Sequence, residues 1–171
     1  YERPPLSKDI LLGKADARSC ARLTVSEAAT LDVRMHLGCR VTAVDAQART
    51  VALGDGRVLG YGALLLATGG APRRLEIPGA NLPGVHYLRT LDDALALRTS
   101  LSAARRLVVI GGGFIGMELV SAARSLGLSV VLLEREAELM ARLLPARLGR
   151  AFRALAERHG AAVHSRATVE S

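Results

Sequence analysis

The stretch that decides the fold is RLVVIGGGFIGMELVSAARSLGLSVVLLE, residues 106–134. Residues 107–110 form a short apolar run, typical of a strand buried on both faces of a parallel sheet. Residues 114–126 have a helical and mostly apolar pattern, and Gly127 follows where a left-handed helix cap is expected. A second apolar run at residues 130–133 completes a predicted β-α-β unit.

Between the first strand and the helix, Gly111, Gly113 and Gly116 form a G-x-G-x-x-G motif. Gly111 permits the tight turn, Gly113 lets a diphosphate approach the backbone, and Gly116 allows helix and strand to pack closely. The diphosphate would meet free N–H groups and the positive end of the helix dipole. Glu134, roughly 20 residues further on, is placed to accept hydrogen bonds from an adenosine ribose. The combination predicts a dinucleotide site, and an ordinary αβ turn with chance glycines is the alternative.

The end of the second strand bears on which nicotinamide cofactor binds. Glu134 would repel a 2′-phosphate, which favours NAD(H) over NADP(H). Arg135 is the opposing signal, since an arginine could accept that phosphate. We expect NADH, with NADPH as the alternative.

Composition bounds the class of protein. The 171 residues allow one ordinary domain or two small ones, and 50% of them are hydrophobic with no Trp, so an aliphatic core is expected. No apolar run approaches the roughly 20 residues of a membrane span, and the polar opening of the chain is unlike a signal peptide. Cys20 and Cys39 form no C-x-x-C pair and no metal spacing, which favours bystander thiols in a reduced cytoplasm.

The net charge of +7 comes almost entirely from arginine, since only Lys8 and Lys14 are lysines. The arginines are scattered, with no run of them and no interleaved aromatic residues, so nucleic acid is not an expected partner. No membrane partner is expected either, since no apolar run is long enough for a span. A solvated surface and an acidic electron-transfer partner are the two interpretations that remain.

The rest of the chain predicts a small antiparallel sheet before the β-α-β unit and a helix and strand after it. Residues 50–53 and 57–59 flank Gly54-Asp55-Gly56, a good hairpin turn. Further strands are predicted at residues 32–37, 40–45, 63–67, 85–88 and 161–164. Helices are predicted in part of residues 15–30, over residues 93–101 with Thr90 or Asp92 as cap, after Pro145, and near Lys8 with Ser7 as cap.

Several motifs, in colinear order, together resemble one family. These are YERPPLSK (1–8), LLLATGGAPR (64–73), LRTLDDA (88–94) and VVIGGGFIGMELVSAA (108–123), with Glu134 after them. They are similar to the FAD-dependent, NADH-dependent ferredoxin or rubredoxin reductases of oxygenase systems, whose fold is shared with glutathione reductase. The resemblance implies an α/β, two-dinucleotide-binding flavoprotein fold: a partial FAD-binding domain with an antiparallel β-meander at residues 1–102, and the start of a Rossmann-like NAD-binding domain at residues 103–171.

The resemblance also implies roles for individual residues. Lys8 would lie beside the flavin N5, where its charge stabilises reduced flavin, and Glu118 would lie near the nicotinamide, paired with Lys8; these are the catalytic candidates. The other implied FAD contacts are Arg3, Pro4, Val41, Ala67, Thr68, Gly69 and Arg89, and the implied NAD contacts are Gly111, Gly113, Phe114, Ile115, Gly116, Glu118 and Glu134.

Taken without the resemblance, these residues carry unequal weight. Lys8 is more often a surface lysine, whereas Glu118 inside an apolar helix requires a partner, because a buried carboxylate is costly. Thr68-Gly69-Gly70 could equally be an ordinary turn, and Arg89 and Val41 are singled out only by the resemblance. The four histidines, His36, His86, His159 and His164, show no catalytic or metal spacing, so no metal site is expected.

The resemblance further implies what this chain lacks. The family begins with its own G-x-G-x-x-G for FAD, and nothing precedes Tyr1, so we expect an interior fragment that holds FAD poorly by itself. Disulfide reductases of this fold carry cysteine in the helix that YERPPLSK occupies here, and this chain has none there. That absence argues against dithiol chemistry and for a flavin that passes electrons singly to an outside acceptor.

We therefore expect a cytoplasmic oxidoreductase that passes electrons from NADH through FAD to a ferredoxin or rubredoxin, as the reductase component of an oxygenase system. One alternative is the flavin subunit of an NAD(P)H nitrite reductase or an NADH oxidase. Others are a flavoprotein that acts by binding, like the apoptosis-inducing factors, and a bare NAD-binding module. The sequence leaves the oligomeric state open.

Overall fold

The computed structural model describes residues 3–170 of the chain. Contacts within the chain divide it into two compact units. One unit runs up to Arg22 and resumes at Ala71, and the other comprises Leu23–Gly70. Among the described residues, no helix is both long enough and apolar enough to cross a membrane.

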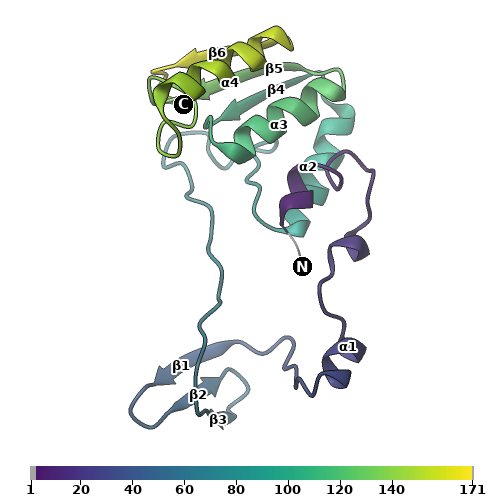
Figure 1. Ribbon diagram of the computed structural model, residues 1–171, viewed down its shortest axis with the longest axis vertical. Helices are drawn as coiled ribbons and strands as arrows, with labels where there is room; N and C mark the ends of the chain where they lie inside the picture. The colour runs from purple at the N-terminus through teal and green to yellow at the C-terminus, as the bar shows by residue number, and fades with distance from the viewer. Residues whose placement is uncertain (1–2, 171) are drawn as a thin grey trace. The chain divides into compact units, whose positions relative to one another are not determined.

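The larger unit is built on a parallel sheet with the strand order β4-β5-β6, shown in Figure 1. The strands are β4 (Arg106–Ile110), β5 (Ser129–Glu134) and β6 (Ala161–Ser165). Helix α3 (Phe114–Ser125) connects the first two strands, and α4 (Ala146–Arg158) connects the second and third. The predicted β-α-β unit and its third strand are therefore confirmed.

The core of this unit lies between the sheet and its helices. Leu132 is fully buried, and Val109, Val120 and Ala123 belong to the same apolar cluster. Helix α2 (Leu91–Ala103) adds Leu97 and Leu101 to that cluster. Thr90 caps α2 in a capping box with Asp93, so the predicted helix is confirmed and Thr90, not the alternative Asp92, is its cap.

One expectation for β4 is wrong. The strand was expected to be buried on both faces, but Val108 is 51% exposed and Ile110 49% exposed. Side chains alternate across a strand, and Val109, which faces α3, is the residue that this helix buries. The face that carries Val108 and Ile110 lines a groove, described below, together with residues 84–88.

A short 3-10 helix, η1 (Pro4–Ser7), packs against α2 and α3 within the same unit. Its residue Leu6 joins Ile10, Cys20 and Ala94 in a second small cluster. Ser7 was expected to cap a helix, but it is the last residue of η1 instead. Prolines are favoured in the first turn of a helix, and here the two prolines of η1 start it earlier than expected.

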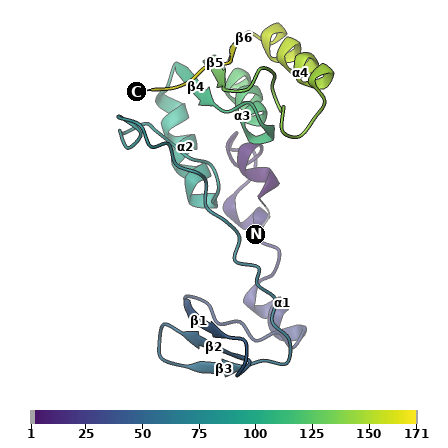
Figure 2. The ribbon, with the colours of Figure 1, turned by 90° about the vertical axis from the view of Figure 1, so that its left-hand side faces the viewer.

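The smaller unit contains α1 (Val25–Thr30) and an antiparallel meander in the order β1-β2-β3, visible in Figure 2. The strands are β1 (Val41–Asp45), β2 (Thr50–Leu53) and β3 (Val58–Gly60), as the hairpin pattern predicted. Residues 15–30 are helical in part, through α1 and the 3-10 helix η2 (Ala17–Cys20) of the larger unit.

Three segments predicted as strands are not strands in the structure: residues 32–37, 63–67 and 85–88. An isolated extended segment leaves its N–H and C=O groups unpaired, so a strand needs a hydrogen-bonding neighbour. Within residues 3–170, none of the six strands pairs with these segments. The apolar run at residues 63–67 is therefore open to solvent, with Leu65 87% and Leu66 67% exposed.

Candidate functional site

The turn from β4 to α3 has the geometry that its glycines require. Gly111 has φ of 104°, in the left-handed region that a side chain disfavours, and its N–H donates to the carbonyl oxygen of Leu133 (2.8 Å). A Cβ atom added at Gly116 would overlap the carbonyl oxygen of Gly111. Only glycine therefore lets the first turn of α3 lie this close to the end of β4.

Gly113 is different, because nothing lies within 4 Å of the place where its Cβ would be. It is the N-cap residue of α3, and within residues 3–170 no side-chain hydrogen bond caps this helix. The first N–H groups of a helix have no partner within it, and they form an anion site with the helix dipole. The open space at Gly113 thus leaves these groups accessible to a diphosphate.

Glu134 lies at the end of β5 and points back to the glycine turn. Its Oε2 accepts a hydrogen bond from the N–H of Gly112 (2.6 Å), and its Oε1 accepts one from the N–H of Glu136 (2.7 Å). A carboxylate offers about four acceptor positions, so both oxygens retain capacity for a hydroxyl donor. These two hydrogen bonds therefore hold the carboxylate in place beside the turn and leave it able to accept further hydrogen bonds.

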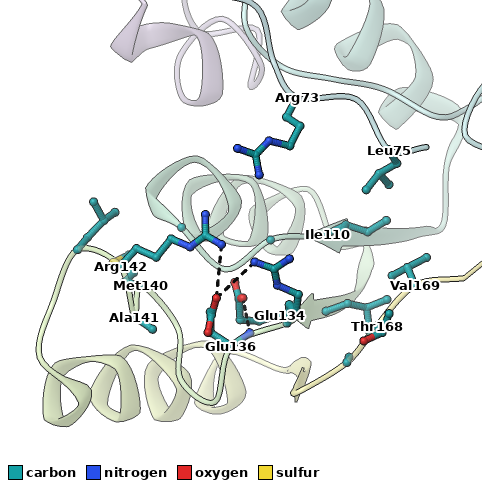
Figure 3. A pocket seen from close by; sticks show the side chains of 16 residues that line it. Arg73, Leu75, Ile110, Glu134, Glu136, Met140, Ala141, Arg142, Thr168 and Val169 are labelled. Atoms are coloured by element: carbon teal, nitrogen blue, oxygen red, sulfur yellow. Dashed lines mark hydrogen bonds and ion pairs between the residues drawn. The ribbon is translucent and has the colours of Figure 1, made fainter. Parts of the chain in front are cut away.

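A cavity of about 550 Å³ joins these parts, as Figure 3 shows. Gly111, Gly113 and Glu134 line it together. The remaining lining residues come from the segments that surround the turn: Arg73, Leu75, Ile110, Leu133, Arg135, Glu136, Met140, Ala141, Arg142, Leu143, Ala167, Thr168 and Val169. An open cradle at Gly113 and a fixed carboxylate at Glu134 fit the diphosphate and the ribose of a dinucleotide.

Two of the three arginines around this cavity share one carboxylate. Arg135 Nη2 lies 3.6 Å and Arg142 Nη2 lies 3.5 Å from Glu136 Oε1. Both side chains are well exposed, so each pair is weak. The Arg135 charge, the counter-signal to Glu134, is thus partly offset by its neighbour Glu136.

A second polar cluster joins η1 to α3 within the larger unit. Lys8 Nζ lies 3.1 Å from Glu118 Oε1, so the expected pair is present. Ser7, which is only 4% exposed, donates its hydroxyl to Glu118 Oε2. Each oxygen of the Glu118 carboxylate therefore has its own partner. Sequence reasoning missed the role of Ser7, and its only signal was the position next to Lys8.

The other predicted site residues fall in both units. Arg3 and Pro4 lie at the start of η1. The backbone N–H of Arg89 donates to Asp93 Oδ2 (3.0 Å) just before α2. In the smaller unit, Val41 begins β1 and is 51% exposed. Ala67, Thr68 and Gly69 lie in an exposed irregular segment of that same unit.

Comparison with known proteins gives consistent matches over most or all of the chain. A family model described as "Pyridine nucleotide-disulphide oxidoreductase" matches residues 1–171. The ferredoxin–NAD(+) reductase component of a p-cumate 2,3-dioxygenase system from Pseudomonas putida is 44% identical over 83% of this chain. Rhodocoxin reductase from Rhodococcus erythropolis is 42% identical over 97% of it. The chain spans 35% and 38%, respectively, of the lengths of these two relatives.

A solved structure gives the same picture. The ferredoxin reductase for the CYP199A2 system from Rhodopseudomonas palustris aligns with a TM-score of 0.94 and 34% identity. That alignment covers 100% of this chain and 42% of the other.

Proposed function

We propose that this chain, which belongs to the pyridine nucleotide-disulphide oxidoreductase family, acts as an oxidoreductase. It would take electrons from NADH and pass them through FAD to a ferredoxin or rubredoxin. Members of this family bind FAD and NAD. The observation that carries the proposal is the open glycine turn at Gly113, with the Glu134 carboxylate fixed beside it. Relatives named as ferredoxin–NAD(+) reductases support the choice of reaction.

The residues of the turn have the task of binding and orienting. The N–H groups of Gly113, Phe114 and Ile115 hold the diphosphate, and Glu134 accepts hydrogen bonds from the adenosine ribose. Gly111 and Gly116 act indirectly, since they allow the backbone to form the cradle. The bound nicotinamide and flavin themselves supply the hydride and electron chemistry.

The Lys8–Glu118 pair is the second functional element of this proposal. Lys8 provides a positive charge that stabilises reduced flavin, and Glu118 keeps that charge in place through the ion pair of 3.1 Å. Arg3, Pro4, Val41, Ala67, Thr68, Gly69 and Arg89 are proposed FAD contacts on the strength of the family resemblance alone. The same applies to the division into a partial FAD-binding domain at residues 1–102 and an NAD-binding domain from residue 103.

Glu134 makes NADH the preferred donor in this proposal, because a second negative charge at the ribose would be repelled. NADH serves as a reductant in the cytoplasm, which is the compartment that the proposal implies. The names of the relatives and the absence of a redox cysteine in residues 1–8 support a ferredoxin partner. Rubredoxin is proposed on the family resemblance alone.

Two measurements test this proposal. Calorimetry measures the binding of NADH to the protein, and an activity assay measures the NADH-dependent reduction of a ferredoxin in the presence of FAD. We expect Glu134→Gln to raise the dissociation constant of NADH at least about tenfold, because the hydrogen bonds from the ribose to a charged acceptor are lost. Glu157→Gln, at an exposed position of α4, is the matched control and should leave binding unchanged. A protein that does not bind NADH would overturn the proposal.

A further inference from the structure

The nucleotide site as described has an imbalance of charge. A diphosphate brings two negative charges, and the Glu134 carboxylate lines the same cavity. The first turn of α3 carries no basic side chain, since it begins with Gly113, Phe114 and Ile115. The helix dipole supplies the equivalent of only about half a positive charge. A further cation near the glycine turn would offset this excess of negative charge.

Three arginines line the cavity, and they differ in how far their charge is already offset. Arg135 and Arg142 lie 3.6 and 3.5 Å from the same Glu136 oxygen. Arg73 makes no ion pair or hydrogen bond through its side chain with any residue in the described part of the chain. Of the three, Arg73 therefore has the charge most available for a ligand.

The position of Arg73 matches this requirement. It lines the cavity of about 550 Å³ and also the neighbouring groove of about 820 Å³ over the exposed face of β4. Gly111 and Gly113 are likewise common to both hollows, so Arg73 stands where the two meet at the turn. Figure 3 shows its side chain reaching toward the cavity from the side opposite Glu134.

We propose that Arg73 is a further cofactor-binding residue, whose guanidinium binds the nucleotide diphosphate from the side opposite the N–H groups of α3. This inference rests on the proposed function, because it concerns the same nucleotide. Arginine suits the task, since its planar fork presents paired N–H donors to phosphate oxygens. The diphosphate would then lie between backbone donors on one side and a full positive charge on the other.

The neighbouring arginine provides a matched control. The guanidinium of Arg74 lies 5.0 Å from the centre of the Tyr87 ring and does not line either hollow. Arg73→Ala and Arg74→Ala remove the same charge from adjacent positions of one exposed segment. Any difference between them in nucleotide binding is therefore due to position and not to net charge.

The experiment measures dissociation constants of NADH, ADP-ribose and adenosine for the protein and both variants. We expect Arg73→Ala to raise the dissociation constants of NADH and ADP-ribose about ten- to a hundredfold, because a hydrogen-bonded contact between opposite charges is lost. Adenosine, which has no diphosphate, should bind all three proteins alike. Arg73→Lys should recover part of the loss, and unchanged circular dichroism and thermal midpoint would show that each variant is folded.

The outcomes separate this inference from the function it rests on. Equal NADH binding by Arg73→Ala and Arg74→Ala would overturn the role of Arg73 and leave the proposed function standing. An equal loss of adenosine and NADH in Arg73→Ala would also overturn it, since the effect would then not involve the diphosphate. Failure of the unaltered protein to bind NADH at all would overturn both.

Discussion

The two compact units both contain a three-stranded sheet, yet they bury their apolar residues very differently. In the larger unit, Leu132 and Leu139 are 0% exposed within one continuous cluster. In Leu23–Gly70, Ala28 and Leu53 are the hydrophobic residues that are buried among those described, while Val58 in β3 is 62% exposed.

The difference follows from how each sheet is connected. A parallel sheet needs crossover helices, and these helices cover the sheet with the same stretch of chain that forms it. An antiparallel meander needs only tight turns, so it brings no second layer of its own. The glycine turn therefore sits on a sheet and helix that support each other locally, which is what a preformed nucleotide site requires.

The largest expected effect is at Gly116, where the backbone of α3 comes closest to the carbonyl oxygen of Gly111 in the larger unit. Gly116→Ala should lower the free energy of unfolding by about 3 kcal/mol or more, because the new Cβ overlaps a backbone oxygen that cannot move aside. Urea denaturation measures this. Gly113→Ala is the control. Because the space around Gly113 is open, this variant should keep the unfolding free energy of the unaltered protein and should weaken NADH binding instead. Equal stability of the two variants would contradict the account of the turn.

The cores of the two units can be compared by removing one apolar side chain from each. Leu132→Ala should cost about 2–5 kcal/mol of unfolding free energy, because it leaves a cavity at a residue that is 0% exposed. Val58→Ala, at 62% exposure, should cost less than about 0.5 kcal/mol. Thermal and chemical denaturation of both variants would check this, and a similar loss in the two would show that β3 is covered by something in solution.

Ser7 tests whether residues 3–22 belong energetically to the larger unit. Ser7→Ala removes the buried hydroxyl that donates to Glu118 and should cost about 1.5–3 kcal/mol. Ser102→Ala is the control, since Ser102 is exposed and donates only to Thr99 of its own helix. Loss of the hydrogen bond also frees Glu118 to leave Lys8, so Lys8 should react faster with an acylating reagent. An unchanged labelling rate would refute a positioning role for Ser7.

The smallest expected effect concerns the turn between β2 and β3. Hydrogen bonds from Arg57, first of all from its side chain, lower the pKa of Asp55 from 3.8 to about 2. A lowered pKa gives stability that is present above the ordinary value and is lost as the pH falls through about 2. Arg57→Gln should return the Asp55 pKa toward its ordinary value, as a carboxyl chemical-shift titration would show. No change on this substitution would mean that the Arg57 contact is absent in solution.

Sequence reasoning succeeded wherever a rule acts over a short stretch of chain. The tight turn at Gly111, the helix cap at Thr90 and the hairpin turn at Gly54-Asp55-Gly56 each depend on residues within one turn of each other. It was wrong at residues 32–37, 63–67 and 85–88, where an apolar run met the local rule for a strand but no strand lies beside it among residues 3–170. The local sequence pattern shows that a segment can adopt an extended conformation. It becomes a strand only when a neighbouring strand pairs with it through hydrogen bonds.

By itself, the sequence determined the β-α-β unit, its glycine turn and the acidic residue at the end of β5, because glycine conformation and helix geometry are properties of the nearby chain. The tertiary structure alone decided that Ser7 reaches the Glu118 carboxylate and that Arg73 lines the same cavity as Gly113. These residues are separated by 111 positions in the first case and lie on different elements in the second. Their meeting depends on how helices and sheet pack, which spacing along the chain does not encode.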